Sequence, residues 1–280
     1  MRRSAAALLL AGWALLITGC VGHSAPESIA VGAGTDPESG VLAHLYAAAL
    51  RYYGSGAHVE QSADPVAALD DADVEVAPGF TGRLLRRFDP GAVARGDEQV
   101  YRTMISALPE GVAAGDYAQS AQDKPAPAVM DATAKRWDGR DVSTLVRQCP
   151  KGKVGAVKGS KPPTAVGTCT LPPIREFADA ATMFAALRSG QVDVAWTSSA
   201  AVDVPDDVVV LADRTSLIRA ENVVPLYRRN ELTERQVLAL NEIAGELDTG
   251  SLADMLRKVA DGADPGAVAS EWLDSHPLGH

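Results

Sequence analysis

The chain is poor in the side chains that most often carry out chemistry. Aromatic residues make up 5% of its 280 residues, and it has five histidines and three cysteines. The histidines lack metal-ligand spacing to one another, and the sequence contains no G-x-S-x-G, no phosphate-binding loop and no G-x-G-x-x-G with its acidic partner. Because no nucleophile stands near a base, we expect neither an enzyme nor a cofactor or metal centre.

Clustered positive charge is also missing. The formal net charge is −10, and Lys and Arg never form a run longer than two residues. Proteins that bind nucleic acid neutralise its phosphates with clustered Lys and Arg. We therefore expect no nucleic-acid partner.

One long apolar run is present, and it lies at the N-terminus. Residues 5–17 follow two arginines and have about the length of a signal-peptide core, which is short for a membrane span. The run ends in LITGC, which closes at Cys20. This ending resembles a bacterial lipobox, although a plain secretory signal with an incidental cysteine is the alternative. We expect a signal peptide over 1–19, a lipidated tether over 20–28, and a location on the extracytoplasmic face of the cell membrane.

If Cys20 carries lipid, two cysteines remain, Cys149 and Cys169. A pair of cysteines in an exported chain is typical of a disulfide, here closing a segment rich in glycine and proline. A metal or redox pair is the alternative, but the spacing matches neither CxxC nor a zinc pattern. We expect the disulfide.

Strand-like and helix-like patterns alternate along the rest of the chain. This alternation predicts an α/β fold with mainly parallel sheets covered by helices on both faces. A capping box over 233–236 and the pair Asp264-Pro265 predict two helix starts. Three further expectations are a strand over 74–77 ended by Pro78 and Gly79, a strand over 117–119, and a single helix over 174–188.

Ligands of such sheets bind at loops beyond the carboxyl ends of strands, where helix N-termini present N–H groups. Three stretches of this chain have that position: 35–39, 80–82 and 196–199.

The second stretch lies in DVEVAPGFTGRLL, at 73–85, which resembles the D-x-x-P-E-Y-T-G-T sequence of substrate-binding proteins of ABC importers for glycine betaine, choline and related quaternary amines. Further elements of that family have counterparts in the same order: QVDVAW at 191–196, VVVLAD at 208–213, NVVPL at 222–226 and the tail over 241–273. The resemblance spans about 29–275.

The resemblance implies a two-lobed type II periplasmic-binding fold, with the ligand in a cleft between the lobes. It places lobe one at 27–112 and 201–280, and lobe two at 113–200. It also implies a monomer that delivers a small-molecule solute to an ABC permease. The implied solute is an osmoprotectant-type zwitterion or quaternary amine such as glycine betaine, choline or carnitine.

Members of the family surround the quaternary ammonium with aromatic rings, because a methylated cation cannot donate N–H hydrogen bonds. The resemblance implies four ring candidates here: Phe80, Trp196, Tyr117 and Tyr101. Candidates for polar contacts are Thr35, Asp36, Ser39, Thr81 and Thr197. The alternative for each ring is core packing, and for Asp36 and Ser39 it is a turn or helix cap.

The chain departs from the family pattern at four positions. Gly79 replaces a glutamate, Phe80 a tyrosine, Arg83 a threonine and Ser199 an aspartate. An arginine near the cleft would disfavour a bare cation and favour an anionic or polar aromatic solute. Two alternatives therefore stay open: the same fold with a sugar-like or aromatic solute, and an envelope interaction lipoprotein without transport activity.

Overall fold

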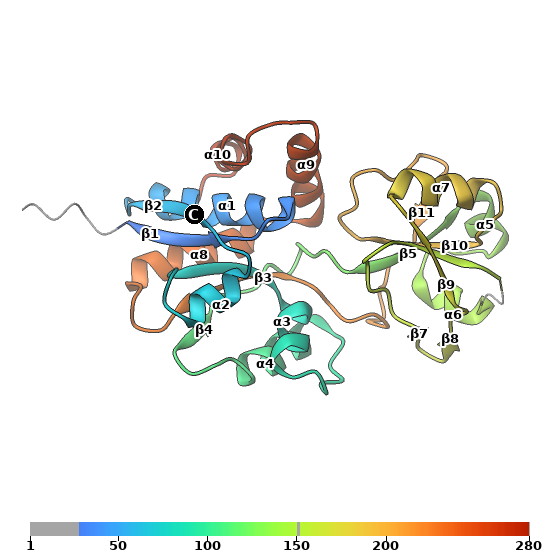
Figure 1. Ribbon diagram of the computed structural model, residues 1–280, viewed down its shortest axis with the longest axis horizontal. Coiled ribbons are helices and arrows are strands. Elements are labelled where there is room, and N and C mark those ends of the chain that lie inside the picture. Colours follow the sequence, from blue (N-terminus) through green and yellow to red (C-terminus); the bar gives the residue numbers. More distant parts are fainter. Residues whose placement is uncertain (1–27, 150–151, 280) are drawn as a thin grey trace, which may run out of the picture.

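The computed structural model describes residues 28–149 and 152–279. Two five-stranded sheets, each with its own helices, form two lobes joined by a pair of extended segments (Figure 1). Cys20, the expected signal peptide and nearly all of the expected tether lie outside the described residues. Within the described part of the chain, no helix is both long and apolar enough to cross a bilayer.

The first lobe is built around a sheet with the strand order β2-β1-β3-β12-β4. Its strands are β1 (Ile29–Ala33), β2 (Ala57–Gln61), β3 (Val76–Phe80), β4 (Val112–Ala114) and β12 (Val223–Arg228). β1 pairs in parallel with β2 and β3, whereas β12 is antiparallel to both β3 and β4. Four of these five strands therefore run in one direction.

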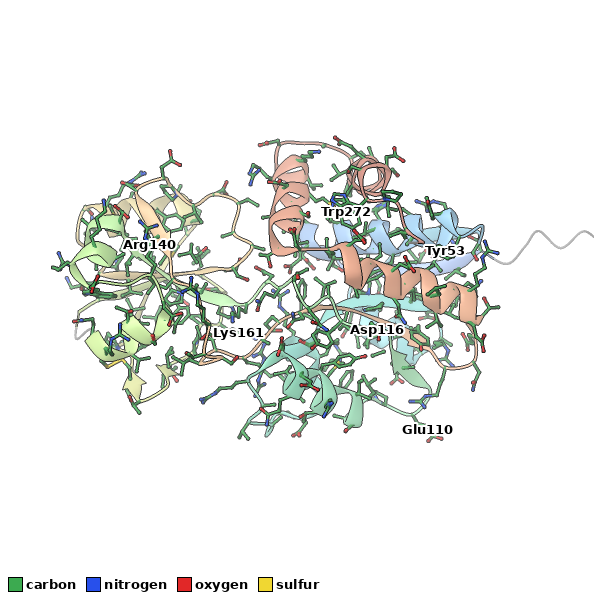
Figure 2. The ribbon with its side chains drawn as sticks, turned by 180° about the vertical axis from the view of Figure 1, so that it is seen from behind. Tyr53, Glu110, Asp116, Arg140, Lys161 and Trp272 are labelled. Carbon is green, nitrogen blue, oxygen red and sulfur yellow. A yellow bond between two sulfur atoms is a disulfide. The ribbon has the colours of Figure 1, made fainter. Side chains whose placement is uncertain are left out.

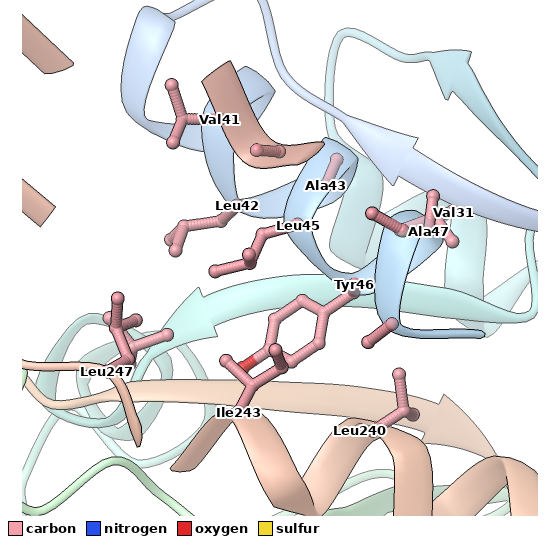
Figure 3. Packing of buried hydrophobic residues seen from close by; sticks show 14 of the residues in the cluster. Val31, Val41, Leu42, Ala43, Leu45, Tyr46, Ala47, Leu240, Ile243 and Leu247 are labelled. Carbon is pink, nitrogen blue, oxygen red and sulfur yellow. The ribbon is translucent and has the colours of Figure 1, made fainter. Parts of the chain in front are cut away.

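Helices cover both faces of the first sheet. One face packs against α1 (Pro37–Tyr52), α8 (Glu234–Glu246), α9 (Thr249–Ala260) and α10 (Pro265–Ser275), and the other against α2 (Pro65–Asp70), α3 (Thr81–Phe88) and α4 (Asp97–Ser106). α1 lies at the centre of its layer, where Tyr46 is buried beside Ile243 of α8 (Figure 3). Each fully buried Leu or Ile in this layer contributes about 2 kcal/mol.

The predicted helix starts of this lobe are confirmed. Thr233 and Gln236 form the capping box, in which each side chain bonds to the backbone N–H of the other residue. Asp264 accepts a hydrogen bond from the backbone N–H of Ala267 at 2.8 Å, and Pro265 opens α10. Both caps satisfy N–H groups that the first helical turn leaves unpaired.

The second lobe is built around a sheet with the order β11-β5-β10-β6-β9. Its strands are β5 (Pro125–Met130), β6 (Val154–Val157), β9 (Ile174–Phe177), β10 (Val194–Ser198) and β11 (Val208–Val210). β5 alone among these five runs opposite to the others. The predicted α/β fold with mainly parallel sheets is confirmed in both lobes.

Helices also cover both faces of the second sheet. α7 (Ala180–Arg188) packs on one face, and α5 (Asp131–Arg136), α6 (Val142–Gln148) and the hairpin of β7 (Ala165–Val166) and β8 (Cys169–Thr170) lie on the other. The predicted disulfide is confirmed, because Cys149 and Cys169 are bonded with their Cα atoms 5.4 Å apart. It holds the hairpin against the end of α6.

Two crossing segments, residues 115–124 and 211–222, connect the lobes. They lie side by side, since the N–H of Asp123 donates to the carbonyl of Glu221 at 2.9 Å. The ammonium of Lys124 and the carboxylate of Asp213 form an ion pair at 3.2 Å, with side chains 11% and 1% exposed. Residues 117–119 belong to the first segment and form no strand, so that prediction is wrong.

Two other predicted elements are corrected. β3 continues through Pro78 and Gly79, because it pairs antiparallel with β12 and Pro78 lies opposite Pro225. The predicted helix over 174–188 is a strand followed by a shorter helix. β9 pairs with β6, and α7 begins after Asp179, whose carboxylate accepts from the N–H of Thr182 at 2.7 Å.

Strand pairing also corrects the expected lobe boundaries. β11 pairs with β5, so residues 208–210 belong to the second sheet although 201–280 were assigned to lobe one. β4 extends the first sheet to Ala114, two residues beyond the expected limit of 112. A three-residue strand carries little sequence signal, and its partner is chosen by tertiary contacts.

Candidate functional site

The carboxyl ends of β1 and β3 open onto a cavity of about 380 Å³ in the first lobe. We call it the first-lobe cavity. Four residues predicted as ligand contacts line it: Thr35, Asp36, Ser39 and Phe80. The first two of the three predicted loops therefore meet at one place, as expected for neighbouring strand ends of a parallel sheet.

Asp36 and Ser39 also have structural roles at this cavity. The carboxylate of Asp36 accepts from the backbone N–H of Ser39 at 2.8 Å and so caps α1. The hydroxyl of Ser39 accepts from the N–H of Gly34 at 2.7 Å. The helix-cap alternative is thus confirmed for Asp36, while both residues remain at the cavity wall.

A second cavity, of about 520 Å³, lies between the lobes. We call it the inter-lobe cavity. Arg83 and Arg86 of α3 line it together with Asp123 and Glu221 of the crossing segments; from the second lobe come Lys161, Met183, Trp196 and Thr197. Figure 2 shows Lys161 on the part of the second lobe nearest the first lobe. The first lobe therefore contributes charged groups to this space, and the second lobe contributes a lysine and apolar groups.

Arg83 lies at the junction of the two cavities and lines both of them. Its guanidinium carbon is 4.2 Å from the centroid of the Phe80 ring. One guanidinium nitrogen donates to Glu38 at 2.5 Å, and another donates to Asp123 at 2.9 Å. The face of Phe80 toward Arg83 is therefore covered by a cation of the chain itself.

Burial shifts the titration of two carboxyl groups around Arg83. Burial, with a smaller contribution from Asp123, raises the pKa of Glu38 to about 8 despite the neighbouring guanidinium. Burial likewise raises the pKa of Glu221 to about 7. Burial opposes the charge of Arg83, but the attraction of Glu38 and Asp123 outweighs it and raises the pKa of that guanidinium.

Glu221 fixes the start of α3 against the second crossing segment. Its carboxylate accepts from the backbone N–H of Arg83 at 2.5 Å and from the guanidinium of Arg86 at 3.1 Å. The approach is so close that a Cβ on Gly82 would lie 2.3 Å from the carbonyl oxygen of Ala220. Glycine is required at position 82 for this steric reason.

Trp196 and Thr197 lie in the second half of β10. Trp196 is 2% exposed and packs in the core of the second lobe while also lining the inter-lobe cavity. Among the described residues, no group accepts a hydrogen bond from its indole N–H. Thr197 is half-buried at the same cavity.

Three predicted contact residues lie elsewhere. Thr81 is fully buried, and its hydroxyl accepts from the backbone N–H of Asn222 at 3.1 Å. The rings of Tyr101 and Tyr117 pack against each other with centroids 4.6 Å apart, and the Tyr101 hydroxyl donates to the carbonyl of Gly115 at 2.7 Å. None of the three lines either cavity. The structure does not bring these tyrosines together with Phe80 and Trp196.

Sequence reasoning missed seven charged residues at the cavities: Glu38, Asp64, Arg86, Arg87, Asp123, Lys161 and Glu221. Two of them had a signal: Glu221 directly precedes the NVVPL element, and Glu38 lies within the predicted stretch 35–39. The others come together only through folding. Across 28–149 and 152–279, no three His, Cys, Asp or Glu side chains are grouped so as to hold a metal ion.

Comparison with known proteins identifies the family. Residues 27–275 match the family described as the substrate binding domain of ABC-type glycine betaine transport system. The chain belongs to this family. It is a substrate-binding domain of the type found in ABC transport systems for glycine betaine, the family that its sequence resembles, and such proteins bind a small molecule for a permease.

Solved structures agree with this assignment at the level of the fold. A glycine betaine/carnitine/choline ABC transporter structure superposes with a TM-score of 0.74 at 16% identity, covering 89% of this chain and 98% of that one. Apo YehZ from Escherichia coli gives 0.70 at 18%, covering 90% and 99%. An ABC-transporter choline binding protein in complex with choline gives 0.56 at 16%, covering 89% of each chain. A comparison with curated protein sequences gave no match. The type II periplasmic-binding fold predicted from the sequence is confirmed.

Proposed function

We propose that this protein is the receptor of an ABC importer and captures an osmoprotectant-type zwitterion or quaternary amine between its lobes. Glycine betaine, carnitine and choline are the solutes of this class that we would test first. The observation that carries the proposal is the inter-lobe cavity of about 520 Å³, to which both lobes contribute side chains. A solute held there would contact both lobes of a monomer at once.

The chemistry of the cavity suits a small zwitterion. Arg86 and Lys161 supply cationic groups toward a carboxylate, and Asp123 supplies an anionic group toward an ammonium. Trp196 adds an aromatic ring, whose face attracts a methylated cation by about 0.5–2 kcal/mol depending on solvent exclusion. Opposite charges in one cavity match a molecule that carries both signs.

Membrane attachment is part of the proposal. The lipobox-like ending at Cys20 supports a lipid anchor on the extracytoplasmic face, which would keep the receptor beside its permease. Fractionation of cells that express the full chain tests it. The wild-type protein is expected with the membranes, and Cys20→Ser in the soluble fraction; an unchanged distribution would count against the anchor.

Isothermal titration calorimetry with glycine betaine, carnitine and choline tests the ligand class. Saturable heat and a rise in melting temperature are expected for at least one of them. Lys161→Ala should weaken binding of a carboxylate-bearing solute about tenfold, or about 1.4 kcal/mol, through loss of a charge-assisted contact.

Lys158→Ala is the matched control for this titration. It removes an exposed lysine of the same loop that lines neither cavity, and should leave affinity unchanged. Absence of heat and of stabilisation with all three solutes would show that the ligand class is wrong, while the family assignment would stand.

A solute without an amine is the second candidate. The observation that favours it is Arg83, which covers the Phe80 face that a quaternary ammonium would need. The same titrations with sugar-like and aromatic solutes separate the two candidates. Tighter binding of these solutes than of the amines would favour the second.

A further inference from the structure

Three groups around Arg83 have the chemistry of a cation-binding site. The Phe80 ring offers an aromatic face, and Glu38 and Asp123 offer carboxylates. Cations are attracted to aromatic faces within about 6 Å of the ring centroid, and the Arg83 guanidinium lies at 4.2 Å. The side chains of Glu38 and Asp123 are 15% and 12% exposed, so solvent screens the attraction of a cation to them less than at the open surface. We call Phe80, Glu38 and Asp123 the cation subsite.

The cation subsite lies at the solute cleft rather than at the outer surface. Arg83 lines both cavities. Its partners Phe80 and Glu38 line the first-lobe cavity, and its partner Asp123 lines the inter-lobe cavity. Its side chain is 45% exposed, whereas its partners are largely buried. Removing the Arg83 side chain would therefore open the ring and both carboxylates to the cleft.

Another arginine of the chain stacks on a ring without forming such a site. The Arg175 guanidinium lies 5.0 Å from the Phe177 ring centroid and donates to the side-chain amide of Gln191. It lines neither cavity. The combination of ring, paired carboxylates and cleft therefore distinguishes Arg83 from an ordinary surface contact.

We propose that Arg83 is a specificity-determining residue whose guanidinium fills the cation subsite and excludes the cationic group of a solute from Phe80. The ammonium of a bound zwitterion then has to lie on the Trp196 side of the inter-lobe cavity. The inference rests on the proposed function in taking the cleft as the place of solute binding. It adds that the chain supplies its own cation at one position of that cleft.

Vacating the subsite tests the inference. Arg83→Ala, prepared as the full mature chain, is titrated with methylguanidinium, which reproduces the missing group, and with choline. The variant is expected to bind methylguanidinium saturably and at least tenfold more tightly than the wild type, and choline affinity should also rise at least tenfold. Adding Asp123→Asn to Arg83→Ala should reverse the gain, because the subsite then loses the carboxylate that pairs with the guanidinium in the wild type.

Arg175→Ala is the matched control, since it also uncovers an aromatic ring, and it should gain no affinity for either probe. Near-UV circular dichroism checks folding, and Arg83→Gln serves as a second variant. Because a ligand that binds the native state stabilises it, a variant unfolded in buffer should regain its native spectrum when methylguanidinium is added.

Three results would overturn the inference: a folded Arg83→Ala that binds neither probe, an unfolded variant that methylguanidinium does not restore, or a wild type that binds choline as tightly as the variant. Failure of the proposed function is a different result. The proposed function fails if the wild type binds none of glycine betaine, carnitine and choline. The gain in methylguanidinium affinity in Arg83→Ala can still be measured in that case, so the two failures are distinguishable.

Discussion

Lys124 and Asp213 form a buried ion pair between the two crossing segments, and we predict that Lys124→Met destabilises the protein strongly. The pair is 3.2 Å apart, and the aspartate side chain is 1% exposed. Asp213 also accepts hydrogen bonds from the backbone N–H groups of Leu217 and Ile218, each at 2.9 Å. Without Lys124, a buried carboxylate would keep these two bonds but lose its counter-charge.

The magnitude follows from the cost of leaving a buried charge unpaired. Removing one partner of a buried ion pair costs about 3–5 kcal/mol. The two remaining N–H bonds stabilise the carboxylate, so we expect a loss near ~3 kcal/mol for Lys124→Met. In the double variant Lys124→Met/Asp213→Asn both charges are gone. Leu217 and Ile218 donate to different oxygens of Asp213, so the single asparagine oxygen can accept from only one of them, and the expected loss is about 2 kcal/mol for the other unpaired N–H.

Urea unfolding followed by circular dichroism measures these differences. The double variant is predicted to be more stable than Lys124→Met alone, which only a charge effect explains. Lys135→Met is the control, because its pair with Asp131 joins side chains 73% and 27% exposed and should contribute about 0.5 kcal/mol or less. The reasoning is refuted if Lys124→Met costs no more than Lys135→Met, or if the double variant is the least stable.

Two further predictions concern stability. Cys149 and Cys169 are separated by 20 positions, and replacing both with serine should lower the free energy of unfolding by ~3 kcal/mol, seen as a lower melting temperature that no longer responds to reductant. Burial raises the pKa of Glu38 to about 8 and of Glu221 to about 7, above the usual 4.5, so the folded state holds protons that the unfolded chain releases. Stability should therefore be greatest below about pH 4.5 as far as these groups contribute, and fall by several kcal/mol in total as the pH rises from 4.5 to 8. Urea unfolding at pH 5.5 and 8.5 measures this change in the free energy of unfolding. The prediction is contradicted if that free energy rises over this interval in the wild type but not in Glu38→Gln.

Much of the fold could be predicted because its signals are local. The capping box of Thr233 and Gln236 and the cap at Asp264 are written in neighbouring residues, and the structure contains both. The segment 174–188 was misread because Ile174 and Phe177 fit a helical spacing as well as a strand. Its first part is a strand because β6 offers an open edge for pairing, which is a tertiary contact.

The candidate site was only partly predictable for the same reason. The loop after β1 and the carboxyl ends of β3 and β10 do line the two cavities, as their places in the sequence suggested. Tyr101 and Tyr117 carry the same aromatic signal as Phe80 but pack on each other. No sequence pattern indicates which carboxylates will surround Arg83, since Glu38 and Asp123 come from α1 and a crossing segment far apart in the chain.

A crystal structure of the protein grown with glycine betaine tests the central claim most directly. The account predicts density for the solute in the inter-lobe cavity, in contact with Trp196 and Lys161, while Arg83 remains on Phe80. Solute bound outside this cavity, or a cavity that stays empty at saturating glycine betaine, carnitine and choline, would contradict it.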